Sequence, residues 1–178
     1  LQADVWASAN DKANKPITAE NSADTVTVTR TTPNKDSGNP NSHVSKAAVS
    51  MKVIGADDAA AVSDNKAGKG NLKFTLKAGQ SVYIVTTIGG GGRTYHNDGT
   101  TLWECEKEPV QEAQELLAEA ADEASVAALN EARQAWWKDF WSTSYVDFGT
   151  EDEKLNQIQK YYYGAQYILG STVREGKK

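Results

Sequence analysis

The first half of the chain alternates between apolar and polar positions, which is the pattern of β-strands with one buried face. In residues 25–30, Val26 and Val28 share one face and threonines occupy the other. Three further runs follow the same rule, namely Val49, Met51 and Val53; Leu72, Phe74 and Leu76; and the β-branched segment 81–88. Because a short glycine-containing turn, 77–80, separates the last two runs, the sequence predicts that 72–76 and 81–88 pair as a hairpin.

Four consecutive glycines occupy residues 89–92 and interrupt this alternation. A glycine cluster after a strand can bind phosphate through its backbone N–H groups. Arg93 stands where a phosphate-binding loop would continue with Lys and Ser or Thr, and no helical pattern follows directly. We therefore expect residues 89–92 to form a mobile loop.

Beyond Pro109 the apolar spacing becomes helical. Residues 110–121 consist mostly of Glu, Gln, Ala and Leu, which favour helix, and 122–125 are expected to break or cap that helix. A second helix then continues to Trp141, with apolar side chains at Val126, Leu129, Trp136 and Phe140. Trp136 and Phe140 continue the stripe of Val126 and Leu129, so we expect them to be more buried than Trp137 and Trp141.

A third helix is predicted after Thr150, which forms a capping-box pattern with Glu153 three residues later. Gly170 is its expected stop. Its apolar positions alternate in spacings of three and four and form one continuous stripe of Leu155, Ile158, Tyr162, Ala165 and Leu169. We expect this stripe to pack on the preceding helix. The second interpretation is self-association through Leu155, Ile158, Tyr162 and Leu169.

Composition places the chain among globular proteins, with 178 residues, 39% hydrophobic and 24% charged. No apolar run approaches the ~20 residues of a membrane span, and no signal peptide is visible. Cys105 is the single cysteine, and His43 and His96 lack the spacing of a zinc site, so we expect neither a metal nor another cofactor.

Acidic charge is concentrated in the second half. Residues 1–108 contain 12 acidic and 12 basic side chains, whereas 109–178 contain 12 acidic and 7 basic ones, which accounts for the net charge of -5. No basic patch that could follow a phosphate backbone is present, so nucleic acid is not an expected partner.

Ten of the 15 aromatic residues lie between Trp136 and Tyr167. Such a concentration indicates either a packed helical core or a surface that stacks against sugar rings. The candidate sugar-binding residues are Trp137 and Trp141.

Two segments of this region are distinctive: 136–145, with the sequence WWKDFWSTSY, and 161–171, with YYYGAQYILGS, followed by Arg174-Glu175-Gly176. Together they resemble the junction region of large bacterial glycoside hydrolases of the α-L-fucosidase-like type. The resemblance covers residues 129–176 well and 25–108 less closely. It implies an N-terminal β-super-sandwich, a helical linker and a catalytic six-hairpin (α/α) barrel. Related sequences often have His where Arg133 stands here.

The expected fold is therefore α+β. An antiparallel β-sandwich portion occupies 1–108, linker helices occupy 109–148, and the first helix of a truncated barrel occupies 149–178. Strands followed by helices independently favour separate layers or domains. A barrel of about a dozen helices needs far more chain than the part after 148.

No carboxylate pair is assigned a catalytic role. Glycoside hydrolysis needs two carboxyl groups about 5–9.5 Å apart, one of them with a raised pKa. The acids at 151–153 are explained by the first turn of a helix. The other acids considered are Glu104, Glu106 and Glu108 on an expected exposed edge strand, the pair Asp57-Asp58, and Asp139 among the aromatic residues.

Three functions remain open. The first is a fragment of a glycoside hydrolase that acts on oligo- or polysaccharides, with the catalytic barrel outside this chain and a periplasmic or extracellular location. The alternative is a non-catalytic carbohydrate-binding or structural β-sandwich module. The third is a helical adaptor that docks a partner helix on the stripe within 155–169.

Overall fold

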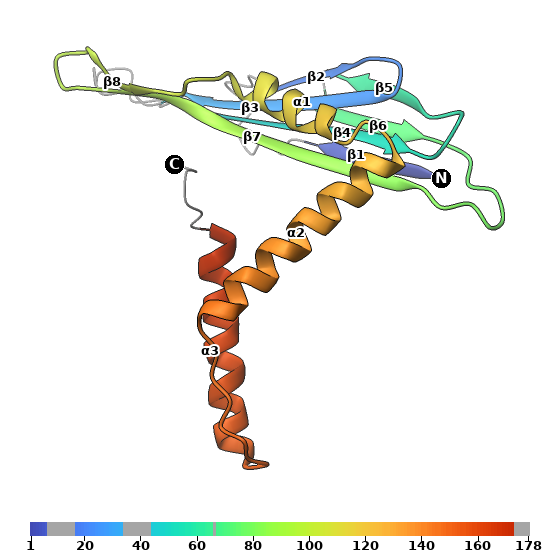
Figure 1. Cartoon of the computed structure of the whole chain (residues 1–178). Coiled ribbons are helices and arrows are strands. Elements are labelled where there is room, and N and C mark those ends of the chain that lie inside the picture. The colour runs from blue at the N-terminus through green and yellow to red at the C-terminus, as the bar shows by residue number, and fades with distance from the viewer. Residues whose placement is uncertain (7–16, 34–43, 66, 173–178) are drawn as a thin grey trace. The chain divides into compact units, whose positions relative to one another are not determined.

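The computed structural model describes residues 1–6, 17–33, 44–65 and 67–172, which form the expected α+β fold (Figure 1). Its strands are β1 (Gln2–Trp6), β2 (Ile17–Asn21), β3 (Thr25–Pro33), β4 (Val44–Ile54), β5 (Ala60–Asp64), β6 (Lys69–Lys73), β7 (Tyr83–Tyr95) and β8 (Thr101–Glu104). Its helices are α1 (Pro109–Glu119), α2 (Glu123–Thr143) and α3 (Glu153–Thr172). The chain divides into two compact units, Leu1–Ala127 and Ala128–Lys178. The proposed domain limits at 108 and 148 stay a prediction.

The strands form two antiparallel sheets in the first unit. The larger sheet has the order β2-β3-β4-β7-β8, and the smaller sheet has the order β1-β6-β5. All neighbouring strands are antiparallel, as the alternating pattern predicted. The long strand β4 lies at the centre of the larger sheet, between β3 and β7.

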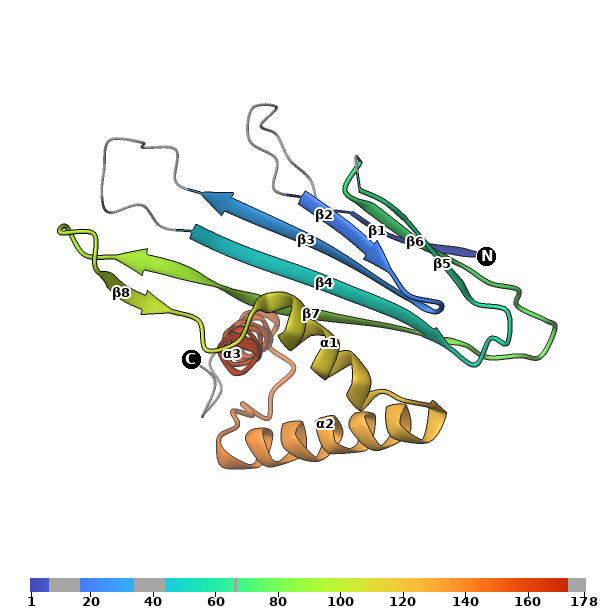
Figure 2. The same ribbon diagram turned by 90° about the horizontal axis from the view of Figure 1, so that it is seen from above.

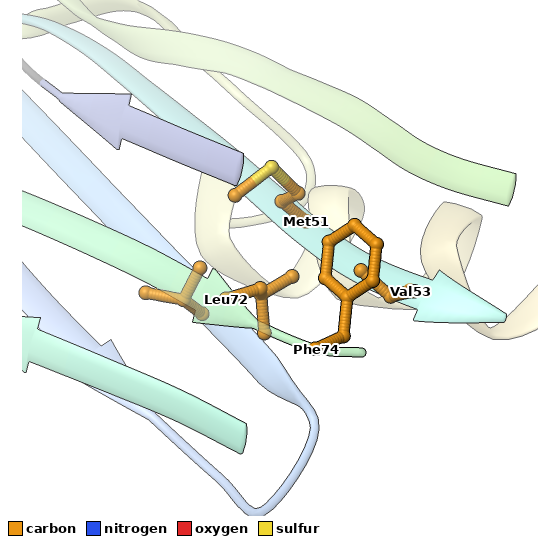
Figure 3. Close-up of a cluster of buried hydrophobic side chains, with 5 residues drawn as sticks. Met51, Val53, Leu72 and Phe74 are labelled. Atoms are coloured by element: carbon orange, nitrogen blue, oxygen red, sulfur yellow. The ribbon is translucent and has the colours of Figure 1, made fainter. Parts of the chain in front are cut away.

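The hydrophobic core lies between the two sheets (Figure 3). It consists of Val26, Met51, Val53, Leu72 and Phe74, all at most 6% exposed. Val26 and Met51 are directly opposite each other in the β3–β4 register, so they share one face of the larger sheet. Gly70 allows the smaller sheet to approach, because a Cβ there would be 2.0 Å from Val26 Cγ2.

Helix α1 covers the other face of the larger sheet, where it contacts β4 and β7 (Figure 2). Ala113, Leu117 and Ala120 recur at intervals of three to four residues and are buried, as helical periodicity requires. The sheet presents Ala48 and a buried hydroxyl pair, in which Thr27 Oγ1 and Ser50 Oγ hydrogen-bond at 2.8 Å. Thr87 Oγ1 donates to Ala113 O at 2.6 Å and ties β7 to α1. The pairing satisfies polar groups that would be costly to bury alone.

The predicted hairpin of 72–76 with 81–88 is wrong. Leu72 lies in β6, which pairs with β1 and β5, whereas 83–88 belong to β7, which pairs with β4. The residues between them cross from one sheet to the other, and Gln80 fixes this crossing by donating from Nε2 to Gly55 O at 2.6 Å. Alternation located the second strand, β7, well but the first only in part, since β6 ends at Lys73 and residues 74–76 lie outside it. Alternation also carries no information about which strand each one pairs with.

The predicted loop at 89–92 is also wrong, because these glycines continue strand β7. A Cβ at Gly89 would lie 1.9 Å from Pro109 O, and one at Gly91 would lie 2.8 Å from Cys105 Sγ. Gly92 has φ +148°, and a Cβ there would be 1.8 Å from Val44 O. Gly89 and Gly91 are therefore needed for close approach of the chain around the start of α1, and Gly92 for close approach to β4.

The helix ends differ from the sequence-based predictions in several places. Residues 122–125 were expected to break or cap the first helix, but α1 already ends at Glu119 with Ala120 as its C-cap. Asp122 instead caps the start of α2, since its Oδ1 accepts from Ser125 N at 2.8 Å. At α3 the predicted cap Thr150 is replaced by Asp152, whose Oδ1 accepts from Lys154 N and Leu155 N at 2.9 and 3.1 Å. Aspartate caps at least as well as threonine, so the nearer residue is used. The helix also continues past Gly170 to Thr172.

The described helices include none with the length and apolar character that crossing a membrane requires.

Replacing Gly89 with Ala should lower the free energy of unfolding by about 1–3 kcal/mol, since the new methyl group must displace the backbone of Pro109. Gly90→Ala is the matched control, because nothing lies within 4 Å of its Cβ position. The measurement is urea unfolding followed by circular dichroism. Equal midpoints for both variants would contradict the close approach of α1 to β7.

Candidate functional site

The candidate site is an aromatic cluster on α2 and α3, within the second compact unit. Trp137 lies at its centre. Its ring is nearly parallel to those of Trp141 and Tyr167, with interplanar angles of 19° and centroid distances of 5.8 and 5.1 Å. Phe140 meets Trp137 edge-to-face at 5.4 Å, and Trp141 meets Tyr163 at 5.6 Å. These are the offset and edge-on geometries that aromatic rings favour.

Helical spacing explains which residues meet. Trp137 and Trp141 are four residues apart on α2, and Tyr163 and Tyr167 are four apart on α3, so each pair lies on one side of its helix. Gly170 extends this side of α3 and is buried. A Cβ at Gly170 would be 3.0 Å from Phe140 Cζ, so the glycine allows α3 to approach the aromatic side chains of α2 closely.

Hydrogen bonds hold the segment between the two helices along α3. Tyr163 Oη donates to Val146 O at 2.8 Å, and the hydroxyls of Ser144 and Tyr162 lie 2.5 Å apart. Tyr162 and Tyr163 therefore bind the connection, whereas Tyr161 Oη accepts from Gln157 Nε2 of the same helix at 3.0 Å. The hydroxyl groups are used for positioning the connection, which supports a rigid helix pair.

The expectation that Trp136 and Phe140 form the more buried pair is wrong. Trp136 is 36% exposed and is the most exposed ring of 136–141, whereas Trp137, Phe140 and Trp141 are half-buried. Trp136 stacks on Phe140 at 5.3 Å, but its own helix supplies that contact. The sequence could not show which side of α2 would meet α3, because apolar residues surround this part of the helix.

The two predicted sugar-binding residues are brought together, and their role stays a prediction. Trp137 has rings of Trp141 and Tyr167 stacked on it, while Tyr167 is itself 56% exposed and Tyr161 is 68% exposed. These two tyrosines were not among the predicted sugar-binding residues, and neither was Tyr145, which is 73% exposed. The four-residue spacing from Tyr163 was the available signal for Tyr167.

The apolar stripe of α3 does not pack on the preceding helix, so that expectation is wrong. Leu155, Ile158 and Leu169 are 38%, 54% and 53% exposed. The side of α3 that contacts α2 instead carries Tyr163 and Gly170, because an aromatic ring and a missing side chain fit around Trp137 and Phe140. Self-association through Leu155, Ile158, Tyr162 and Leu169 stays a proposal.

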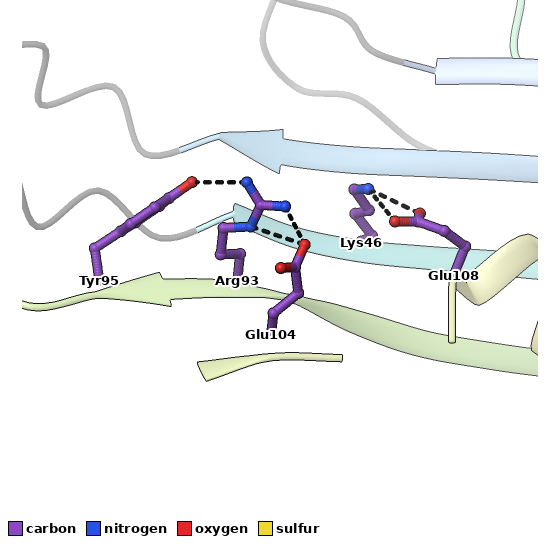
Figure 4. A network of polar contacts seen from close by, with 5 residues as sticks. All are labelled: Lys46, Arg93, Tyr95, Glu104 and Glu108. Atoms are coloured by element: carbon purple, nitrogen blue, oxygen red, sulfur yellow. Dashed lines mark hydrogen bonds and ion pairs between the residues drawn. The ribbon is translucent and has the colours of Figure 1, made fainter. Parts of the chain in front are cut away.

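The acids near the end of β7 form ion pairs with basic side chains (Figure 4). Arg93 donates from Nε to Glu104 Oε1 at 2.9 Å, and the pKa of Arg93 is raised above its usual range by this hydrogen bond. Lys46 Nζ binds Glu108 at 2.8 Å. Glu104 lies on the edge strand β8, as expected, but Glu106 and Glu108 lie beyond it. The ion pairs Arg93–Glu104 and Lys46–Glu108 are at the surface, so each contributes little to the free energy of unfolding.

Several other carboxyl groups have local structural contacts. Asp58 Oδ1 accepts from Thr75 N at 2.9 Å, and hydrogen bonding to Thr75 lowers the pKa of Asp58. The pKa of Asp122 is lowered by Ser125, and that of Glu115 by Lys107. A general acid needs the opposite shift. Asp139 is exposed, and Asp152 caps α3.

Among the described residues, no cluster of His, Cys, Asp and Glu could hold a metal ion. His96 is exposed at the turn between β7 and β8, where its backbone N–H donates to Thr100 O at 2.7 Å. His43 and Arg174-Glu175-Gly176 lie outside the described residues. Cys105 is half-buried beside Gly91.

Comparisons of the chain with protein-family models, with curated proteins and with solved structures found no match in any of the three.

Replacing Trp137 with Ala should destabilise the helix pair by about 3 kcal/mol, because its ring contacts both helices. Tyr145→Ala is the control, since Tyr145 is 73% exposed, and its effect should be below about 0.5 kcal/mol. Thermal unfolding followed by helical circular dichroism measures both. A Trp137 variant as stable as the Tyr145 variant would show that the cluster is not the core of this unit.

Proposed function

We propose that the chain is part of a glycoside hydrolase that acts on oligo- or polysaccharides and whose catalytic groups lie outside residues 1–178. The observation that carries the proposal is the pair of aromatic segments, 136–145 and 161–171, that resemble the linker–barrel junction of α-L-fucosidase-like enzymes. Rings of the two segments are in contact between α2 and α3, Trp137 with Tyr167 and Trp141 with Tyr163. This supports their being one structural element, as a junction into a helical barrel requires.

In this proposal the chain has a supporting role, and carbohydrate is bound through the whole enzyme. The sheets form a scaffold beside the barrel, and the α2–α3 pair begins the helical domain. Hydrogen bonds lower the pKa values of Asp58, Glu115 and Asp122. These carboxyl groups therefore favour the charged form, as expected of groups with a structural role. A periplasmic or extracellular location belongs to the same proposal.

The alternative is a non-catalytic carbohydrate-binding or structural module. The exposed rings of Tyr161 and Tyr167 favour it, because sugar rings present C–H faces that stack on accessible aromatic side chains. The downstream reading frame separates the two functions. About 400 further residues of repeated helical hairpins would favour the enzyme, and an adjacent stop codon would favour the module.

A helical adaptor is the third candidate. Its support is the exposure of Leu155, Ile158 and Leu169, whose alternating spacing of three and four residues matches the seam that helices use to pair. A partner helix or a second copy would cover the same stripe.

The purified chain should not hydrolyse aryl glycosides of fucose, galactose, arabinose or rhamnose. The physical reason is that Asp58, Asp152 and Glu108 are used in a backbone hydrogen bond, a helix cap and an ion pair, and the shifted pKa values of Asp58, Glu115 and Asp122 are lowered and not raised. Release of nitrophenol is the measurement. Turnover that disappears when one acid within 1–178 is replaced by its amide would refute the placement of the catalytic groups elsewhere.

A further inference from the structure

The smaller sheet covers only part of the larger one. Strand β5 packs beside β2, and β6 packs beside β3, so the order β5-β6-β1 runs along the order β2-β3-β4. Ala3 and Val5 of β1 reach the core cluster that contains Met51 and Val53 of β4. Among the described strands, none continues the smaller sheet beyond β1, where the next position would lie over β7.

The face of β7 beneath that position is apolar and exposed. Ile84 is directly opposite Val53, and Ile88 is directly opposite Val49, so both side chains point to the same side of the sheet as the core. They are 51% and 67% exposed. Trp103 of β8, opposite Thr94, is on this side as well and is 52% exposed. The surface formed by Ile84, Ile88 and Trp103 therefore continues the floor of the existing sheet interface.

The edge of β1 beside this floor has backbone groups that the sheet does not use. Leu1 and Phe74 exchange both backbone hydrogen bonds, at 2.7 and 3.1 Å. In an antiparallel pair such residues alternate with ones whose N–H and C=O point to the other edge. By the β1–β6 register, those residues are Gln2 and Asp4. No described strand pairs with them.

We propose that a partner polypeptide adds an extended segment to the free edge of β1 and covers Ile84 and Ile88. Neighbouring strands lie ~4.8 Å apart and packed sheets ~10 Å apart, so a strand added at β1 rests on the face of β7. The backbone of the added strand hydrogen-bonds to the free N–H and C=O groups of Gln2 and Asp4. Every second side chain of that strand contacts Ile84 or Ile88. The occupant is therefore a strand with large apolar residues at every second position.

Two other occupants fit less well. Residues 7–16 and 34–43 of this chain contain no Val, Leu, Ile, Met or aromatic side chain that could cover the isoleucines. A second copy paired antiparallel through β1 would place both larger sheets on the same side of the joined sheet. There, β7 of one copy and β4 of the other would require the same space.

The outer face of β1 adds a charge preference. The side chains of Gln2 and Asp4 point away from the core, and Gln2 Nε2 donates to Asp4 Oδ1 at 2.7 Å. A cationic residue on the outer face of the added strand would be attracted to Asp4. The inference is independent of the proposed carbohydrate function, since it uses only residues of the first compact unit.

The test uses a synthetic peptide of about nine residues with valine at alternate positions, threonine between them and a lysine at each end. Binding to the whole chain is followed by NMR, with amide hydrogen exchange as the site-specific readout. We expect binding that slows exchange at Asp4. Ile88→Glu should weaken it by about tenfold or more, because a charge would be buried. Val62→Glu is the matched control, as Val62 is 50% exposed on β5.

A second peptide, N-methylated at every second residue on the edge that faces β1, separates strand pairing from apolar adhesion. It should not bind. Absence of binding by the unmodified peptide, or equal binding by both peptides, would overturn the proposal. Slowed exchange at Thr86 and Ile88 in place of Asp4 would show that the peptide extends β7 and not β1. A dimer in sedimentation that Ile88→Glu dissociates would identify a second copy as the occupant.

Discussion

The packing of α1 against a part of β7 that has no side chains is the contact on which the first unit depends. The larger sheet has two faces that must be covered, and Gly89 allows the backbone of Pro109 to lie where a side chain would otherwise project. Because α1 is brought this close, Ala113 and Leu117 are buried on the sheet and Thr87 can hydrogen-bond to the helix. The opposite face is covered by the smaller sheet, which extends only as far as β1.

Much of this unit could be predicted from local pattern. Alternation located Val26, Val28, Met51 and Val53 on strands with a buried face, and the change to helical spacing located α1. Strand pairing could not be predicted, because a short turn between two alternating runs is equally compatible with a hairpin and with a crossing between sheets. The glycines at 89–92 were misinterpreted for a related reason: their role depends on Pro109 and Cys105, which are distant in sequence.

The second unit shows the same limit at the level of the candidate site. The aromatic concentration left a packed helical core and a sugar-stacking surface both open, and contact between the helices was expected through the apolar stripe of α3. The contact between α2 and α3 is made instead by Trp137, Tyr163 and Gly170. The regular stripe of Leu155 and Ile158 remains on the exposed side. Periodicity therefore identified an apolar side of α3 but not the surface that covers it. The side of α3 that packs on α2 is determined by the size of the aromatic rings and by the absence of a side chain at Gly170. If this unit begins a helical domain, as proposed, one side of α3 packs on α2 and the exposed stripe contacts a further helix.

Hydrogen exchange at the glycines of β7 tests the account most directly. Gly90 N–H donates to Glu112 Oε2 at 3.1 Å and points away from β4, so the alternation of an antiparallel ladder directs Gly89 and Gly91 N–H toward β4. The account predicts that the Gly89 and Gly91 amides exchange slowly, with opening that approaches global unfolding, while Gly79 in its exposed turn exchanges rapidly. Exchange at Gly89 and Gly91 as fast as at Gly79 would show that residues 89–92 form a loop and would contradict the packing of α1 on β7.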